Sequence, residues 1–222
     1  MEHPVFSSLS QNTLRVSALN AIRENILNGV LRPGQQLVQA DIAAQMNISR
    51  APVREALRQL EEEGLVESVP YRGTSVARLS RRDILEVFTL RGALEGLALR
   101  LAITCRTDEE LMSLPPILDE MSEAAQGKDY AKLNSADIRF HTELCRLADH
   151  RHLIRSWEMN INLIRRILAL RNKLSPFQVV VDMHRPIVAA VLARDAQAAQ
   201  AAIEDHCINS GETLAALWAE DK

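Results

Sequence analysis

The chain is poor in cysteine, glycine, proline and aromatic residues, and each scarcity excludes a class of protein. Three cysteines among 222 residues, with no Cys-x-x-Cys pair, support neither a disulfide framework nor a cysteine-based zinc finger. Eight glycines, eight prolines and 4% aromatic residues do not suit an all-β sandwich, and the abundant Ala, Leu, Ile, Arg and Glu favour helices.

The chain also lacks long apolar runs and an excess of positive charge. No run approaches the roughly 18 apolar residues that span a bilayer, and the first 13 residues carry no signal pattern, so we expect a cytoplasmic protein without a membrane partner. The 26 Lys and Arg residues against 29 Asp and Glu residues give a net charge of −3. This balance excludes a uniformly basic nucleic-acid coat and leaves a local basic face possible.

The first 79 residues have the pattern of a small DNA-binding domain. Helical spacing of apolar residues predicts helices over 13–29 and 38–46, and a third that begins after Ser49 as N-cap and ends at Gly64. Alternating residues predict two antiparallel strands, 65–69 and 74–77, around a turn at 70–73. This order indicates a helix-turn-helix followed by a wing.

Arginines recur along the third predicted helix. Arg50, Arg54 and Arg58 fall at i, i+4 and i+8, so their guanidinium groups project from one stripe. Such a stripe fits the major groove of DNA, where arginine binds guanine edges, and Arg72 at the wing tip adds a phosphate or minor-groove contact. The alternative is that the stripe forms ion pairs on a solvated face with glutamates of the same helix, namely Glu55, Glu61 and Glu62.

Residues 80–222 predict a second domain that is all helix. Ser80 and Asp83 form the N-terminal signature of a helix that runs to about residue 103. Further helices are expected over 107–126, 129–148, 150–172, 176–194 and 195–219. The predicted fold class is therefore mainly α: an N-terminal winged helix-turn-helix and a C-terminal all-α helical bundle.

Four residues of the second domain have the composition of a metal site. Asp137 and His141 are one helical turn apart, and His184 and His206 interrupt apolar stretches of two later helices. One carboxylate and three imidazoles suit Zn²⁺, Ni²⁺, Fe²⁺, Mn²⁺ or Co²⁺. The alternative for each histidine is a buried, hydrogen-bonded core residue. Two further histidines at a helix junction are interpreted as surface capping residues, His150 and His152.

Five short motifs fall within residues 14–78: Gly29-x-Leu31-x-Pro33-Gly34, Asp41-Ile42-Ala43, Ser49-Arg50-x-Pro52-Val53-Arg54-Glu55-Ala56-Leu57, Glu63-Gly64-Leu65-Val66 and Gly73. Together they resemble the winged helix of GntR-family transcriptional regulators. The resemblance implies a homodimer on a short palindromic operator in double-stranded DNA, with Ser49, Arg50 and Arg54 in contact with DNA and the wing at Arg72-Gly73 in the minor groove. The chain departs from many members at Ala40, where they have a charged or polar residue.

The second domain resembles the all-helical effector domain of the FadR-like branch of that family, the FCD type. Its Asp-x3-His, His, His pattern is matched by the four residues above, with fitting flanks at Phe140 and at Cys207-Ile208. The resemblance implies a bundle of six or seven helices in which a metal helps to hold a small carboxylate effector. Arg91 and Glu95 match a polar pair of such domains, in which Arg91 either clamps the effector or forms a salt bridge with Glu95.

We therefore expect a DNA-binding transcriptional regulator, a repressor of a catabolic or transport operon, and not an enzyme. A small organic acid effector at the metal site would modulate its operator binding. Two alternatives remain from the residues alone. The first is a metal-responsive sensor, in which the metal itself would be the signal. The second is a metal-dependent hydrolytic enzyme, in which an open coordination position on the metal would activate water.

Overall fold

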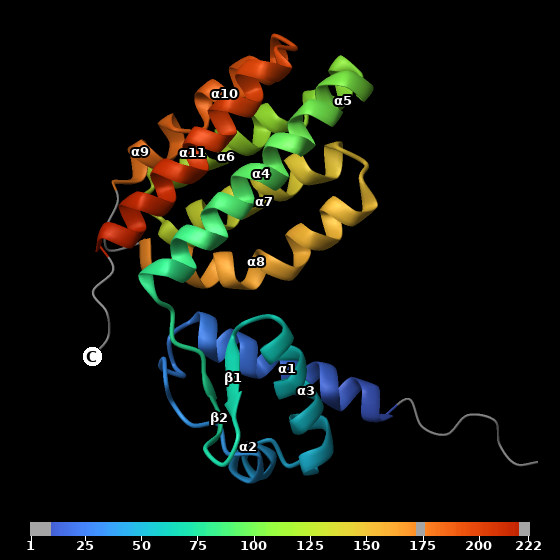
Figure 1. The fold of residues 1–222 in the computed structure, drawn as a ribbon, viewed down its shortest axis with the longest axis vertical. Coiled ribbons are helices and arrows are strands. Elements are labelled where there is room, and N and C mark those ends of the chain that lie inside the picture. The colour runs from blue at the N-terminus through green and yellow to red at the C-terminus, as the bar shows by residue number, and fades with distance from the viewer. Residues whose placement is uncertain (1–9, 172–175, 218–222) are drawn as a thin grey trace, which may run out of the picture. The chain divides into compact units, whose positions relative to one another are not determined.

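The computed structural model describes residues 10–171 and 176–217 and is mainly helical, which confirms the predicted fold class (Figure 1). The chain divides into two compact units, Met1–Arg78 and Leu79–Lys222. The division lies one residue before the predicted one. Each unit is described by itself.

The first unit contains three helices and a two-stranded sheet: α1 (Ser10–Leu27), α2 (Gln39–Gln45), α3 (Arg50–Glu62), β1 (Val66–Val69) and β2 (Gly73–Val76). The strands are antiparallel, with Val66 opposite Val76 and Val69 opposite Gly73. Both α1 and α2 pack on α3, whose buried side forms one apolar core with them. The opposite side of α3 faces solvent, so this packing fixes which residues of the helix a ligand can reach.

The segment before α2 also joins the sheet, a feature that sequence patterns did not predict. Gly34 N–H donates to the Val76 carbonyl at 2.8 Å, and Val76 N–H donates to the Gln35 carbonyl at 2.9 Å. Gly34 has a φ of +76°, a conformation that glycine adopts without strain. These bonds tie the wing to the chain that leads into the helix-turn-helix.

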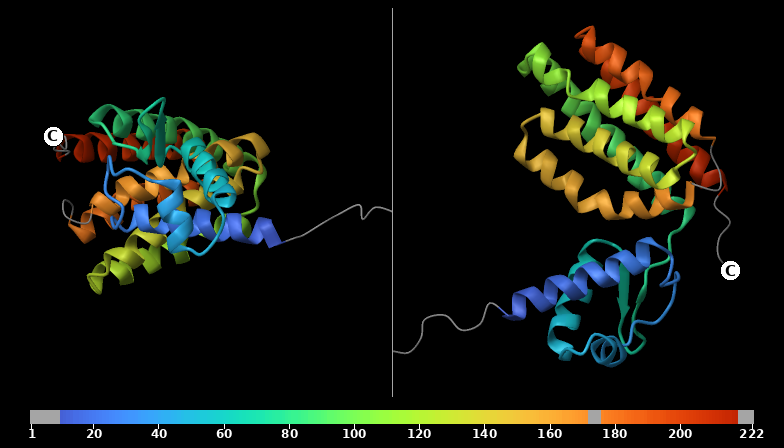
Figure 2. Two further views of the ribbon diagram at one scale, coloured as in Figure 1. Left: turned by 90° about the horizontal axis from the view of Figure 1, so that it is seen from below. Right: turned by 180° about the vertical axis from the view of Figure 1, so that it is seen from behind.

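The second unit contains eight helices within the described residues: α4 (Arg81–Cys105), α5 (Asp108–Leu111), α6 (Leu114–Gln126), α7 (Tyr130–Leu147), α8 (Arg151–Arg171), α9 (Phe177–Asp182), α10 (Arg185–Leu192) and α11 (Ala196–Leu217). The predicted N-terminal signature of α4 is present, because Ser80 and Asp83 form reciprocal capping bonds. Figures 1 and 2 show α4 beside α11 and α6 beside α7. Helix α7 also packs on α4.

Two predicted helices, 107–126 and 176–194, are each broken in the structure, and proline explains both breaks. Pro115 and Pro116 occupy the first turn of α6, and Pro186 occupies the first turn of α10. Proline has no N–H to donate and its ring clashes with the carbonyl four residues earlier, so a helix can begin there but cannot continue through it. The single-helix prediction was wrong for both segments.

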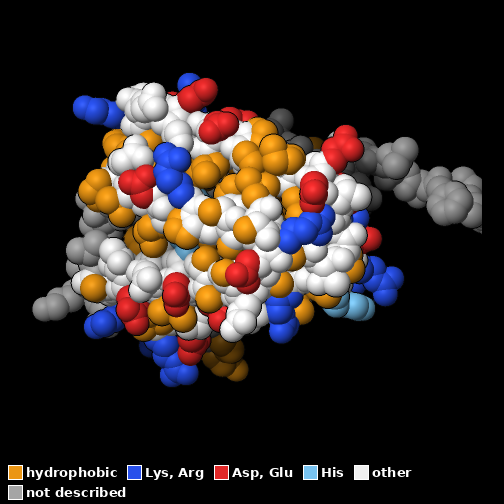
Figure 3. Space-filling model, turned by 90° about the horizontal axis from the view of Figure 1, so that it is seen from above, with side chains coloured by type: hydrophobic (Ala, Val, Ile, Leu, Met, Phe, Trp, Pro, Cys, Tyr) orange, Lys and Arg blue, Asp and Glu red, His pale blue; other side chains and the backbone are white. Residues whose placement is uncertain are grey.

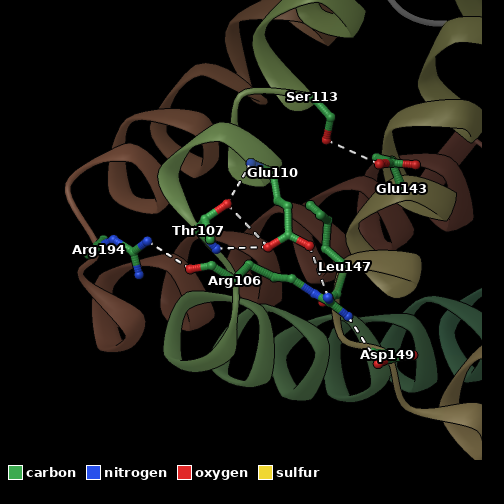
Figure 4. A network of polar contacts seen from close by, with 8 residues as sticks. All are labelled: Arg106, Thr107, Glu110, Ser113, Glu143, Leu147, Asp149 and Arg194. Carbon is green, nitrogen blue, oxygen red and sulfur yellow. Dashed lines mark hydrogen bonds and ion pairs between the residues drawn. The ribbon is translucent and has the colours of Figure 1, made fainter.

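Arg194 holds together the end of α4 and the turn after α10. Its guanidinium donates to the carbonyl of Arg106 at 2.7 Å (Figure 4). It also donates to the carbonyl of Ile103 at 2.9 Å and pairs with Asp108. These carbonyls lie at the C-terminal end of α4, where the helix leaves them without helical partners and where positive charge is favourable. Arg194 has a φ of +55°, so its backbone bears strain that these bonds offset.

We predict that Arg194→Ala lowers the free energy of unfolding by about 1–2 kcal/mol, because two carbonyls lose a charged donor. Urea denaturation measures this change. Arg185→Ala is the matched control, since within residues 10–171 and 176–217 Arg185 forms only an exposed pair with Asp182 and its removal should leave the stability nearly unchanged. Equal midpoints for the two variants would contradict the capping role.

Candidate metal centre and DNA-binding face

Helix α7 carries the first two side chains of the candidate metal centre. Asp137 and His141 are both buried and lie one turn apart on the side of α7 that faces the interior. Phe140, which is also buried, places its ring edge-on to the rings of His141 and His184 at centroid distances of 5.5 and 5.0 Å. The aromatic ring limits the positions available to both imidazoles.

His184 lies at the break between α9 and α10, and the break provides its hydrogen-bond acceptor. Its backbone N–H donates to the Val181 carbonyl at 3.0 Å, so the carbonyl of Val180 loses the donor that a continuous helix would supply. The imidazole Nδ1 of His184 lies 2.7 Å from that carbonyl. A carbonyl only accepts, and therefore Nδ1 carries a hydrogen, which leaves the lone pair of the neutral imidazole on Nε2.

His206 of α11 completes a cluster of three buried histidines. One ring nitrogen from each of His141, His184 and His206 lies within 4.8 Å of the others. The Nε2 atoms of His141 and His184 are 3.2 Å apart, and Asp137 Oδ1 is 3.4 Å from Nε2 of His184. The structure thus brings together all four residues in which the sequence suggested metal ligands, from α7, the α9–α10 junction and α11.

Glu95 of α4 contacts the far side of the cluster. Its Oε2 meets Nδ1 of His141, and its Oε1 accepts from Arg91 Nε at 3.0 Å. Burial is the largest influence on the pKa of Glu95 and opposes ionisation, but His141 and Arg91 outweigh it and hold that pKa below its ordinary value. An ionised carboxylate only accepts, so Nδ1 of His141 carries a hydrogen, and in the neutral imidazole Nε2 has the lone pair.

The acceptor atoms of the cluster therefore point at one another. Nε2 of His141, Nε2 of His184 and a carboxylate oxygen of Asp137 converge within a buried space, and with both imidazoles neutral their lone pairs repel. A cation or a proton among them removes this repulsion. The oxygen and nitrogen donors fit Zn²⁺ and the other divalent transition ions named above.

Arg91 forms the salt bridge that was one of its two expected roles. The predicted salt bridge with Glu95 is present, and both side chains are buried. Burial lowers the pKa of Arg91, but Glu95 and other nearby groups outweigh it and raise that pKa above its ordinary value, so the side chain stays charged. Nη2 of Arg91 is buried and has no hydrogen-bond partner among the described residues. A buried cationic donor of this kind can still receive an anion.

A pocket of about 70 Å³ reaches the cluster between α9 and α11. Its lining is mostly apolar, with two hydroxyl groups and one imidazole, and consists of Val179, Val180, Met183, His206, Ser210, Thr213 and Leu214. A larger groove of about 360 Å³ between α6 and α7 contains the exposed pair Glu120–Arg139 and none of the three histidines. We therefore place the candidate ligand site at the smaller pocket.

In the first unit, Arg50, Arg54 and Arg58 all lie on the exposed side of α3. Of these three arginines, only Arg58 forms an ion pair with a glutamate of the described residues. Its contact with Glu62 is 3.9 Å long and exposed. Ser49 occupies the N-cap position but makes no side-chain capping bond within the described part of the chain, unlike the expected N-cap. Its hydroxyl and two of the guanidinium groups are thus available at the start of α3.

The wing tip presents Arg72 and Gly73 as expected and also a residue that sequence reasoning missed. Tyr71 is fully exposed, with a relative accessibility of 108%, and has a φ of +66°. Gly73 has a φ of +84° and begins β2. The turn therefore holds an aromatic side chain outward beside Arg72. The only sequence signal was its position after Pro70 in a predicted turn.

One face of the second unit carries charges of both signs. In the face drawn in Figure 3, acidic and basic side chains are interspersed over the described residues. No helix within residues 10–171 and 176–217 is long and apolar enough to cross a membrane. A winged helix with an exposed arginine stripe, joined to a helical bundle with a buried histidine cluster, is typical of a DNA-binding regulator with a second, helical domain.

Comparisons with known proteins agree with this class. Residues 14–76 match the model described as "Bacterial regulatory proteins, gntR family", and residues 86–209 match the "FCD domain" model. The probable D-xylose utilization operon transcriptional repressor of Paenarthrobacter nicotinovorans is 33% identical over 89% of this chain and 87% of that protein. The transcriptional repressor RspR of Escherichia coli strain K12 is 26% identical over 90% of this chain and 88% of that protein.

Solved structures share the fold. Escherichia coli McbR/YncC has a TM-score of 0.75 at 20% identity, covering 93% of this chain and 99% of that one. A GntR regulator from Rhodococcus sp. RHA1 has a TM-score of 0.76 at 22% identity, covering 93% and 100%. The chain belongs to the GntR family of bacterial transcriptional regulators and has an FCD domain. It is not an enzyme, so the hydrolytic alternative is set aside.

The cluster generates a prediction about metal content. His184→Ala and His206→Ala should each lose most of the bound metal, because each removes one of the converging donors. His150→Ala and His152→Ala are the controls, since both side chains are exposed and His150 caps α8 by accepting from Leu153 N–H. Elemental analysis of the purified variants measures the content. Equal stoichiometric metal in all four variants would show that the two buried histidines are core residues.

Proposed function

We propose that this regulator is a repressor, that it binds a palindromic operator as a homodimer in the cytoplasm, and that a small carboxylate at a buried divalent metal alters its DNA affinity. The DNA contacts would come from Ser49, Arg50, Arg54 and Arg58 of α3 and from Arg72 and Gly73 of the wing. The exposure of these residues supports this role. Tyr71 joins them as a wing contact because its ring is wholly exposed between Pro70 and Arg72.

The homodimer follows from the way in which winged helices recognise DNA. One α3 reads only a few base pairs, and two copies related by two-fold symmetry read the two halves of a palindrome at a fixed spacing. A family member that represses transcription works where the chromosome is, which supports the cytoplasmic location.

The observation that carries the ligand proposal is the convergence of acceptor atoms around Nε2 of His141 and Nε2 of His184, 3.2 Å apart. The metal would be held by Asp137, His141, His184 and His206. The bound ion would keep an open coordination position for a carboxylate oxygen. Arg91 would orient the second oxygen through Nη2, while its Nε stays bonded to Glu95. The apolar pocket beside His206 would receive the rest of the effector.

The metal-responsive sensor is the second candidate function, and the same histidine cluster favours it. The two candidates differ in what changes DNA binding. A sensor responds to the metal alone, whereas an effector-responsive repressor needs the metal and a carboxylate together.

Arg54→Ala should weaken specific operator binding by about 1–3 kcal/mol, because a guanidinium that can contact a base edge is lost. This is roughly a 5- to 150-fold rise in Kd. Fluorescence anisotropy at fixed salt, on a DNA fragment selected by the protein from a random pool, measures the change. Arg82→Ala removes an exposed arginine of α4 with the same charge change and should leave Kd unaltered. Unchanged affinity in Arg54→Ala would count against the assignment of α3.

The effector is tested on the same DNA with Zn²⁺ alone, with acetate, lactate, gluconate or citrate alone, and with each carboxylate plus Zn²⁺. We expect release only in a combined arm, and loss of that release in Arg91→Lys, which keeps the charge but not the two-pronged donor. Release by Zn²⁺ alone supports the sensor instead. Binding that no arm alters overturns the ligand proposal and leaves the DNA-binding assignment standing.

A further inference from the structure

We propose that Glu95 is a positioning residue of the metal centre: through its contact with His141 it fixes the imidazole tautomer and ring orientation that metal binding requires. The inference rests on the proposed metal site. It assigns to Glu95 a role beyond that of salt-bridge partner to Arg91.

The contact comes from a different helix and uses a separate oxygen. Oε1 of Glu95 accepts from Arg91 on the same helix, one turn away, whereas Oε2 meets Nδ1 of His141 on α7. Glu95 has no exposed surface and His141 has 1%. Each carboxylate oxygen therefore has one partner, and water does not compete for the bond to His141.

The bond determines which nitrogen of His141 can bind a metal. An imidazole that donates its Nδ1–H to a carboxylate presents Nε2 as the ligand atom in a fixed ring orientation. Nε2 of His141 is the atom that faces Nε2 of His184 at 3.2 Å. Rotation of the ring or the opposite tautomer would remove one donor from the cluster.

His184 provides an internal comparison. Its Nδ1 lies 2.7 Å from a backbone carbonyl, that of Val180, so the acceptor behind this ring comes from the helix break, while the Asp137 carboxylate lies 3.4 Å from its Nε2. Of these two histidines, His141 is therefore the one whose Nδ1 contacts a side chain, Glu95, that can be substituted. If Glu95 only neutralised Arg91, its removal would lower stability without changing the tautomer of His141.

The experiment compares Glu95→Gln and Glu95→Ala with wild type in the full chain. Zn²⁺ affinity is measured by competition with a chromophoric chelator, and the tautomer of His141 in the metal-free protein by long-range ¹H–¹⁵N NMR, assigned through His141→Gln. Glu143→Gln is the matched control, because Glu143 lies two residues after His141 on α7 and accepts from Ser113 at 3.1 Å, outside the cluster. Thermal denaturation of each variant reports stability separately.

We expect Glu95→Ala to bind Zn²⁺ about 10–100-fold more weakly than wild type and to lose the single Nδ1–H form of His141. Glu95→Gln should keep that form, since an amide oxygen still accepts, but show a smaller loss of affinity because the charge is gone. Glu143→Gln should match wild type. If Glu95→Ala does not fold, the affinity of Glu95→Gln decides alone.

The outcomes separate the two proposals. Wild-type affinity in the Glu95 variants, or a wild-type His141 without hydrogen on Nδ1, overturns the positioning role while the metal site stands. Absence of Zn²⁺ binding in wild type overturns the metal site, and the positioning role falls with it. A stability loss without any change in affinity or tautomer shows that Glu95 serves Arg91 only.

Discussion

The facing Nε2 atoms of His141 and His184 are the constraint on which the buried cluster of the second unit depends. Both Nδ1 atoms have partners, Glu95 for His141 and the Val180 carbonyl for His184, so both Nε2 atoms point into the same buried space. An apolar interior favours a proton or a cation between such atoms. The cluster is therefore a candidate place for a cation, and the ion pair of Arg91 with Glu95 lies beside it.

The two units separate two kinds of recognition. In the first, positive charge lies on the surface of α3 and the wing, where the phosphates and base edges of DNA can be reached. In the second, Arg91, Glu95 and Asp137 are buried among apolar side chains, where the proposed small ligand would bind. Three residues, Ala77 to Leu79, separate the end of β2 from Ser80, the N-cap of α4. The helix that carries Arg91 and Glu95 thus continues directly from the wing.

Much of the fold could be predicted from sequence because its signals are local. Apolar periodicity and the Ser80–Asp83 signature identified α4, and alternation around 70–73 identified the wing. The breaks at Pro115 and Pro186 were missed because apolar spacing continues through them, although the prolines themselves were a visible signal. The bonds of residues 34–37 to β2 join segments about 40 residues apart, and no local pattern reveals such a pairing.

The candidate site likewise combines residues that the sequence pattern identified with a long-range contact that it did not reveal. Residue type and spacing suggested Asp137, His141, His184 and His206, and the fold brings them together. The contact of Glu95 with His141 spans 46 positions and joins two helices, so sequence spacing related Glu95 only to Arg91. A lone acidic residue in the apolar stretch 92–99 was the available hint that Glu95 is buried.

The proline at position 186 gives the site an unusual dependence. A continuous helix through 177–192 would bring the backbone N–H of His184 to the Val180 carbonyl, and the imidazole would then share its acceptor. The helix break instead leaves this carbonyl to the side chain. A relative of this protein that kept all three histidines but replaced this proline with a good helix former would retain the histidine pattern in its sequence and lose the backbone conformation that places His184 in the cluster.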